Sequence, residues 1–352
     1  MTVFAGSEKA VKTEKWQNAN LEIVICPRRA SRNGYDFYRF ERKILEAAMR
    51  ESGVDLIHAH WCYEFAAAAL AGRKPVLVTA HDCPNQIARF FRWTTAYPHW
   101  LFRSWLGYRV CRRATDLTCV SPYVEKNIRR YTASHARVSV IPNGVPDPLF
   151  AAGKARSWSV ASSQPHRIVT VLEGFGLRKN AAAALRAFQK LRCFFPDAEL
   201  HMYGGDFESG GPAEVWARSH GCLRNVRFRG RLPQAELHRE LASAATLFLH
   251  PALEESHPMA VIEAMALGVP VIGGAQSGGV PFTLDQGRAG ELADVAHPEK
   301  LAQCLRDLLS DLPRCQKIAR AGWEYAWRHF REDDMIDHYI QAYEDLISRR
   351  RV

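Results

Sequence analysis

No apolar run in this 352-residue sequence approaches the roughly 20 residues that a helix needs to span a bilayer. The first segment, MTVFAGSEKAVKTEK, lacks the apolar stretch of a signal peptide, so we expect a cytoplasmic protein. The sequence also lacks C-x-x-C pairs, and its nine cysteines show no disulfide framework, which favours buried thiols in a reducing compartment. A composition with 47% hydrophobic and 24% charged residues excludes a disordered or collagen-like chain.

Acidic residues are scarce in the first half of the chain. Residues 1–150 hold 22 Lys and Arg against 13 Asp and Glu, whereas residues 151–352 hold 25 against 24. Nearly all of the net charge of +10 therefore lies in the first half. This asymmetry predicts that the first half meets an anionic partner, such as nucleic acid, membrane headgroups or a phosphorylated ligand.

Short β-branched runs alternate with helical periodicity along the chain, which predicts βαβ units and parallel sheets. The predicted strands are Leu21–Cys26, Leu56–His60, Val76–Ala80, Leu117–Val120, Val138–Ile141, Arg167–Leu172, Glu199–Tyr203, Val226–Arg229, Thr246–His250 and Val269–Ile272. The predicted helices include Tyr38–Ser52, Asn180–Cys193, Ala260–Leu267 and one long aromatic helix at Ala321–Arg351.

The length of the chain suits two domains of the α/β class, each a Rossmann-like doubly wound parallel sheet. Asp147–Pro165 is rich in Ala, Ser, Gly and Pro and lacks periodicity, so we expect the linker there. The predicted domains are residues 1–150 and 151–326, and residues 327–352 are expected to cross back and complete the first domain. Ligands of such folds bind in the crevice at the carboxyl ends of the strands.

The most informative string is Leu249–Gly279, with the sequence LHPALEESHPMAVIEAMALGVPVIGGAQSGG. A predicted strand ends at His250, and a helix begins near Pro258, which is favoured at the first helical position. The backbone N–H groups of Ser256–Ala260 are then expected to form an anion site at the start of this helix. Two carboxylates, Glu255 before the helix and Glu263 one turn inside it, are placed to accept hydrogen bonds from sugar hydroxyls.

The Glu255-x7-Glu263 spacing, followed by EAMALGVPVI and a Gly pair, resembles the signature of retaining family-4 glycosyltransferases with the GT-B architecture, the group 1 type of bacterial polysaccharide biosynthesis. Five further segments resemble the family in the same order: DLIHAHW (Asp55–Trp61), VLVTAHD (Val76–Asp82), VIPNGV (Val140–Val145), LRKN (Leu177–Asn180) and FRGRL (Phe228–Leu232).

The resemblance implies a nucleotide-sugar site. The implied catalytic residues are His81, Lys179 and Glu255, of which Lys179 would neutralise the departing diphosphate and His81 would touch the sugar or the acceptor. The implied donor-binding residues are Arg178, Gly230, Arg231, Ser256, His257, Pro258, Met259 and Glu263. The family generally needs no metal, and the sequence holds no D-x-D motif, so we expect neither a metal nor another cofactor.

Two departures from the family pattern bear on the site. The family usually has an Arg about six residues before the Lys, where this chain has Glu173, and Arg178 or Arg231 is the candidate replacement. Family members also open with a strand, a Gly-rich loop and a helix ahead of the segment that MTVFAGS resembles. Relative to the family, about thirty residues of a first βα unit are therefore expected to be missing.

Residues 86–113 hold six Arg, eight aromatic residues and no acidic residue. This composition suits a membrane interface or a lipid-linked acceptor, although ordinary core packing and nucleic-acid stacking remain open as alternatives. No nucleic-acid motif accompanies the segment, so no nucleic-acid partner is expected. The candidate membrane or acceptor residues are Arg89, Arg92, Trp93, Trp100, Arg103 and Trp105.

We therefore expect a retaining hexosyltransferase, peripheral on the inner face of the plasma membrane, that uses a nucleotide diphosphate sugar and a lipid-linked or polysaccharide acceptor. Two alternatives stay open at the level of sequence. One is a GT-B sugar-nucleotide epimerase or phosphorylase, which would share the same crevice. The other is an inactive partner subunit that keeps the donor fold.

Overall fold

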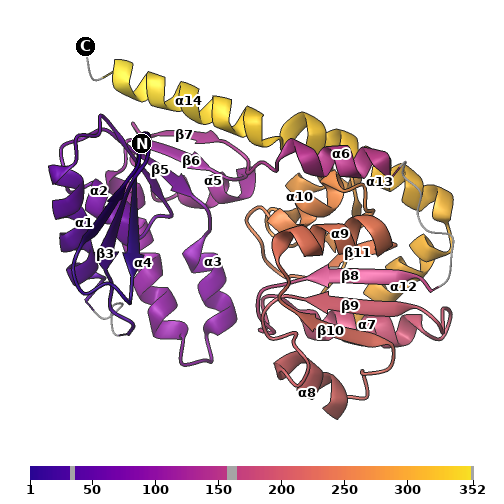
Figure 1. Ribbon diagram of the computed structural model, residues 1–352. Coiled ribbons are helices and arrows are strands. Elements are labelled where there is room, and N and C mark those ends of the chain that lie inside the picture. Colours follow the sequence, from indigo (N-terminus) through magenta and orange to yellow (C-terminus); the bar gives the residue numbers. More distant parts are fainter. Residues whose placement is uncertain (32–35, 157–164, 350–352) are drawn as a thin grey trace. The chain divides into compact units, whose positions relative to one another are not determined.

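The computed structural model describes residues 1–31, 36–156 and 165–349 (Figure 1). The chain forms two compact units: unit 1 comprises Met1–Ile141 and Asp337–Val352, and unit 2 comprises Pro142–Ile336. Each unit contains parallel β-sheet and several helices, as expected for the α/β class.

The strands of unit 1 form two separate sheets. β1, β3 and β2 make a three-stranded sheet, in which β1 is parallel and β2 antiparallel to β3, while β4 to β7 make a wholly parallel sheet. β2 and the division into two sheets were not predicted. The bounds are β1 (Thr2–Ser7), β2 (Glu14–Gln17), β3 (Glu22–Pro27), β4 (Ile57–His60), β5 (Val76–Ala80), β6 (Asp116–Cys119) and β7 (Arg137–Val140).

The helices of unit 1 bury narrow apolar faces against these sheets. In α1, Leu45 and Met49 lie four residues apart on the buried face, together with Glu41, whose carboxylate is paired with Arg29. The bounds are α1 (Arg39–Glu51), α2 (Glu64–Ala69), α3 (Pro84–Ala88), η1 (Arg89–Phe91), α4 (Tyr97–Arg113), α5 (Pro122–Ile128) and, in its later part, α14 (Glu332–Ser348).

Unit 2 is built on one parallel sheet with the strand order β10-β9-β8-β11-β12-β13. Counted from β8, this is the doubly wound order 3-2-1-4-5-6, whose direction reverses between β8 and β11. β11 is wholly buried, which explains its continuous apolar run. The bounds are β8 (Arg167–Val171), β9 (Glu199–Tyr203), β10 (Val226–Gly230), β11 (Leu247–His250), β12 (Val271–Gly274) and β13 (Glu291–Ala293).

The helices of unit 2 pack closely on this sheet. Every residue of α10 from Val261 to Ala266 is buried, so all of this helix after its first two residues lies within the core. The bounds are α6 (Asp147–Ala155), α7 (Ala181–Leu191), α8 (Pro212–Ser219), α9 (Gln234–Ala244), α10 (Met259–Ala266), α11 (Val280–Thr283), η2 (Asp285–Gly287), α12 (Pro298–Leu309), α13 (Leu312–His329) and the start of α14.

The predicted linker Asp147–Pro165 is wrong in its first part, which forms helix α6. Gly153 lets α6 approach α10, because a Cβ at Gly153 would lie 2.0 Å from the carbonyl oxygen of Ala266. Arg156 extends the contact by donating to the carbonyls of Leu241 and Ala242 in α9. α6 therefore belongs to unit 2, and residues 157–164 lie outside the described residues.

The predicted single helix at Ala321–Arg351 is also wrong, because α13 ends at His329 and α14 begins at Glu332. Between them the backbone pairs with Val145: Val145 N–H donates to the Phe330 carbonyl, and Glu332 N–H donates to the Val145 carbonyl. Phe330 is buried there against other aromatic rings. The later part of α14 lies on unit 1, where Tyr343 OH is 2.7 Å from His58 Nδ1.

Candidate functional site

The predicted donor-site residues of unit 2 gather where the strand order of its sheet reverses. Arg178 and Lys179 lie between β8 and α7, and Glu254 and Glu255 lie in the loop that follows β11. Because β8 and β11 are parallel neighbours, both loops leave the same edge of the sheet. This is the usual ligand position in doubly wound folds.

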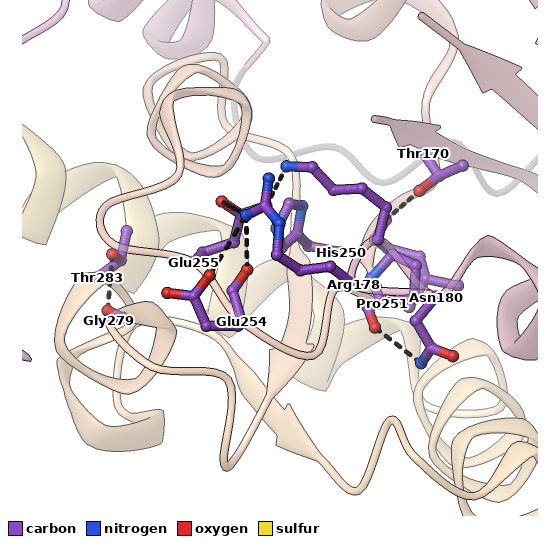
Figure 2. A network of polar contacts seen from close by, with 11 residues as sticks. Thr170, Arg178, Asn180, His250, Pro251, Glu254, Glu255, Gly279 and Thr283 are labelled. Carbon is purple, nitrogen blue, oxygen red and sulfur yellow. Dashed lines mark hydrogen bonds and ion pairs between the residues drawn. The ribbon is translucent and has the colours of Figure 1, made fainter. Parts of the chain in front are cut away.

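One backbone hydrogen bond and the side chain of Asn180 hold the loops together. Leu253 N–H donates to the Arg178 carbonyl over 2.8 Å. Asn180, in a left-handed conformation with φ 55°, donates from Nδ2 to the carbonyl of Pro251 (Figure 2) and to that of Val295. Asn tolerates this conformation better than most residues, so it suits the position directly before α7. The loop that carries Lys179 is thereby fixed on the loop that carries Glu255.

Glu255 is the most strongly paired carboxylate of the site. Lys179 Nζ lies 2.5 Å from its Oε1, His250 Nε2 lies 3.4 Å from Oε1, and Arg178 lies 3.7 Å from Oε2 (Figure 2). Burial raises the pKa of Glu255, but His250 and the charges of Lys179 and Arg178 outweigh it and lower the pKa to about 2. Glu255 is therefore ionised at neutral pH.

The start of α10 adds backbone donors beside this network. Pro258 caps the helix in an extended conformation, and its carbonyl accepts from the N–H groups of Val261 and Ile262, so the N–H groups of Met259 and Ala260 are the ones without an acceptor inside the helix. His257 is buried, and its Nδ1 accepts a hydrogen bond from Asn143 N–H over 3.2 Å. Burial lowers the pKa of His257 to about 3, so the ring is neutral and carries its proton on Nε2. Ser256 is buried as well, whereas Met259 is 38% exposed.

Glu263 lies on α10 and is oriented by α9. Its Oε1 accepts from Gln234 Nε2 over 3.0 Å, and its Oε2 lies 3.5 Å from His238 Nε2. Only 9% of Glu263 is exposed. The sequence did not predict Gln234 or His238 as part of the site.

Gly230 and Arg231 follow β10. Gly230 has φ 65°, which favours glycine. Arg231 forms an ion pair with Glu173, and a Cβ at Gly205 would touch both side chains. Glu173, which stands where the family usually has an Arg, is thus paired with Arg231, one of the two predicted replacements.

His81, the third predicted catalytic residue, lies in unit 1 directly after β5. Its Nε2 is 2.8 Å from His60 Nδ1, and its ring contacts Trp61, which has φ 62° and is 48% exposed. Burial, followed by the charge of His60, lowers the pKa of His81 to about 4. His81 is therefore neutral at physiological pH, and its partner His60 was not among the predicted site residues.

The six predicted membrane or acceptor residues occupy different environments. Trp93 is 90% exposed between η1 and α4, and Arg92 lies over its ring. Arg89 and Trp105 are exposed, whereas the ring of Trp100 stacks on Phe91. Arg103 is a packing residue, because its guanidinium lies 3.7 Å from the ring centroid of Tyr63. α3 and α4 run side by side (Figure 1), and Trp93 lies in the segment that connects η1 to α4.

Within residues 1–31, 36–156 and 165–349, no group of three or more His, Cys, Asp or Glu has the arrangement of a metal site. No helix in the same residues has the length and apolar character of a membrane span.

Two family models match the chain. Residues 1–147 match the model described as Glycosyltransferase Family 4, and residues 155–324 match the model described as Glycosyl transferases group 1. The chain belongs to the group 1 glycosyltransferases.

Curated relatives of this group 1 chain include D-inositol 3-phosphate glycosyltransferase of Corynebacterium diphtheriae, 30% identical over 62% of this chain and 54% of the relative. MMP alpha-(1->4)-mannosyltransferase of Mycolicibacterium hassiacum is 26% identical over 86% of this chain and 73% of the relative. The chain spans about half the length of the first curated relatives it matches.

Solved structures show the GT-B fold. Sucrose-phosphate synthase from Thermosynechococcus elongatus superposes with a TM-score of 0.79 at 19% identity, over 99% of this chain and 89% of that one. Anabaena Alr3699/HepE in complex with UDP and glucose gives a TM-score of 0.70 at 16% identity, over 92% and 86% of the two chains. At these identities the likeness concerns the fold.

Proposed function

We propose that this group 1 chain transfers a hexose from a nucleotide diphosphate sugar to an acceptor, with retention of the anomeric configuration. The observation that carries the proposal is the pair of cations, Lys179 and Arg178, held at the switch point of the unit 2 sheet beside the start of α10. A diphosphate that leaves a sugar gains negative charge in the transition state, and prearranged cations and N–H groups stabilise that charge.

Each site residue has a role in this proposal. Lys179 and the first N–H groups of α10 bind the diphosphate, while Glu255 orients the transferred sugar. Glu263, held by Gln234, accepts from the ribose hydroxyls. In this proposal the retaining reaction needs no protein nucleophile, because the leaving phosphate itself acts as the base that takes the proton of the acceptor hydroxyl. Lys179 supplies positive charge for this step, in the loop that Arg178 fixes, so we propose that transfer needs no divalent metal.

The acceptor in this proposal is lipid-linked or saccharide, and the chain acts in the cytoplasm on an anionic membrane surface. Exposed Trp93 and its neighbours Arg92 and Arg89 supply an aromatic ring and positive charge, which suit a headgroup region. Relatives named for inositol phosphate and phosphatidylinositol mannoside acceptors support a phosphate-bearing acceptor. Relatives named GDP-mannose-dependent support GDP-mannose as the first donor to test.

Donor transfer is tested with wild type, Lys179→Ala and Glu255→Ala, each supplied with nucleotide sugars and a panel of phosphate-bearing acceptors. We expect both variants to lose about 10²-fold or more in kcat/KM, because each removes charge stabilisation or sugar binding. Lys190→Ala is the matched control, since Lys190 is an exposed lysine of α7 paired with Glu299. Equal rates in all four proteins would refute the proposal.

Two further readouts address the chemistry. Proton NMR of the product formed early in the reaction reports the anomeric configuration, and an inverted product would refute retention. Transfer in the presence of EDTA tests metal independence, and loss of activity restored by a divalent cation would refute it. A modified nucleotide sugar formed without an acceptor would indicate an epimerase instead.

A further inference from the structure

His250 is a buried titratable side chain of the unit 2 site that has no role in the proposed reaction so far. It ends β11, is 2% exposed, and lies beside Glu255 in the polar network (Figure 2). Within residues 1–31, 36–156 and 165–349, neither nitrogen of its ring makes a hydrogen bond. A polar group buried without a hydrogen bond costs free energy of folding, so we expect this ring to gain a partner in another state of the site.

His250 and Lys179 approach the same oxygen of Glu255. Lys179 Nζ lies 2.5 Å from Oε1, and His250 Nε2 lies 3.4 Å from the same atom. Arg178 lies 3.7 Å from the other oxygen and 3.3 Å from Glu254, so its charge is shared between two carboxylates. In the free protein Lys179 is therefore the main partner of Oε1, and His250 is the next group within reach.

The charges around Glu255 balance only while no donor is bound. Two cations, Lys179 and Arg178, face two carboxylates, Glu254 and Glu255. The diphosphate of a nucleotide sugar adds a negative charge on each phosphate group, and in the proposed function it attracts Lys179. Glu255, whose side chain is 13% exposed, then retains a share of Arg178 and a neutral imidazole. A buried carboxylate that loses its cation favours protonation of the nearest base.

We propose that His250 is a positioning residue, which takes up a proton when a nucleotide sugar binds and then donates from Nε2 to Glu255 Oε1 in place of Lys179. The inference rests on the proposed function, because it requires a diphosphate that attracts Lys179. The proton comes from solvent and adds to the free lone pair of the neutral imidazole, and no other covalent bond forms or breaks. The imidazolium keeps Glu255 ionised and fixed, so its lone pairs remain available to sugar hydroxyls.

The other histidines of the site are less suited to this proton. Burial lowers the pKa of His257 to about 3, and its Nδ1 is already occupied by a backbone N–H. His238 lies 3.5 Å from Glu263, on the other carboxylate of the site. Among the described residues, His250 is the one histidine with an ion-pair contact to Glu255. Imidazole is also the side chain whose charge ordinarily changes between pH 5 and 8.

Calorimetric titration of the full chain with GDP-mannose and with UDP-glucose measures the proton directly. The phosphate groups of both probes are esterified and do not titrate near neutral pH, so protons drawn from the buffer go to the protein. Titrations at pH 7 in phosphate and in Tris buffer, whose ionisation enthalpies differ, give the number of protons taken up. We expect the wild type to take up about 0.5 proton or more per bound nucleotide sugar.

His250→Gln keeps a neutral N–H donor of similar reach but cannot become a cation, so we expect it to lose the proton uptake. Because binding takes up a proton, wild-type affinity should rise about 3–10-fold from pH 8 to pH 6, whereas that of His250→Gln should change by less than about 2-fold. His201→Gln is the matched control, since His201 is buried on β9 of the same sheet and lies 2.9 Å from Glu199. We expect it to retain the wild-type uptake.

Nitrogen-15 NMR of histidine-labelled protein locates the proton. The His250 signals, assigned with His250→Gln, should change from those of a neutral ring to those of an imidazolium when nucleotide sugar saturates the site. A merely structural His250 would show no such change and no dependence of affinity on pH. If His250→Gln fails to fold, His250→Asn provides both the assignment and the loss of uptake.

The outcomes separate this inference from the proposed function. Nucleotide-sugar binding without proton uptake, or uptake that persists in His250→Gln, would overturn the inference and leave the proposed function in place. Protonation of Glu255 itself would appear as the second of these results. Absence of binding by both nucleotide sugars would overturn the proposed function and the inference together.

Discussion

The titration of Glu255 is the sharpest consequence of the unit 2 site. Its carboxylate is 13% exposed and lies within 4 Å of Lys179, Arg178 and His250. Burial raises its pKa, but these neighbours lower it from 4.5 to about 2. A shift of this size corresponds to roughly 3 kcal/mol in favour of the folded state at neutral pH.

The direction in which pH changes the stability follows from the difference between the pKa values of Glu255 in the folded and unfolded states. Because the pKa of Glu255 is lower in the folded than in the unfolded state, its stabilisation is complete well above pH 4.5 and falls as the pH approaches 2. About 2 kcal/mol of it is expected to be lost between pH 7 and pH 3. Glu255→Gln removes this component, so its urea stability should fall less steeply over the same range than that of the wild type.

Carboxyl ¹³C NMR measures the pKa directly, with Glu255→Gln used to assign the resonance. Lys179→Met should raise the pKa of Glu255, because it removes the nearest positive charge. Lys190→Met, at a distant exposed lysine, should leave it unchanged. A wild-type Glu255 that titrates at pH 4 or above would refute the ion-pair network as described.

Three further predictions concern stability and surface contacts. Gly153→Ala should lower the free energy of unfolding by about 1–3 kcal/mol, measured by urea denaturation, because its Cβ would meet the Ala266 carbonyl; Gly176→Ala, with open space around it, should have little effect. Thr118→Val should cost about 0.5–1.5 kcal/mol by removing one buried hydrogen bond of Thr79 Oγ1, which keeps His58 Nε2 at 2.6 Å, and an unchanged unfolding midpoint would contradict that contact. Trp93→Ser should weaken sedimentation with anionic vesicles without changing the melting temperature, whereas Arg103→Met should lower the melting temperature because Arg103 packs on Tyr63.

Buried strands were the most predictable part of the fold. β5 and β9 have the predicted bounds, and the other predicted strands agree within two residues at either end. Their apolar, β-branched runs are a local property of the sequence, so each can be recognised without its neighbours. β2 was missed because EKWQ is short, polar and mostly exposed, and only its pairing with β3 makes it a strand.

The break between α13 and α14 shows where periodicity misleads. The aromatic pattern continues across Phe330, but the backbone there pairs with Val145, which is 185 residues away in the sequence. One local signal was present: Glu332, Asp333 and Asp334 form an acidic first turn, which is typical of a helix start. The backbone pairing with Val145 depends on tertiary structure and cannot be recognised from the local sequence.

The site could be predicted only for residues that lie in motifs. Lys179 and Glu255 were both expected at the donor diphosphate, but their direct ion pair was not. His250 was read as the end of a strand, and Gln234 and His238 lie on α9, outside every motif. These three side chains contact Glu255 or Glu263 from other helices and strands. The spacing of residues in the sequence carries no information about such contacts.

This chain has Glu173 where the family usually has an Arg, so the positive charge has to come from another residue. The exposed fractions of Arg178 and Arg231 indicate which of the two supplies it. Arg178 is 23% exposed and is bound to both Glu254 and Glu255, so an incoming anion would have to displace two carboxylates. The Glu173–Arg231 pair is 64% and 71% exposed, and ion pairs in solvent hold their partners weakly. A diphosphate carries more charge than one carboxylate and therefore competes well for Arg231. Of the two candidates, Arg231 is thus the one that we expect to leave its partner and bind the donor, while Arg178 fixes the loop that presents Glu255.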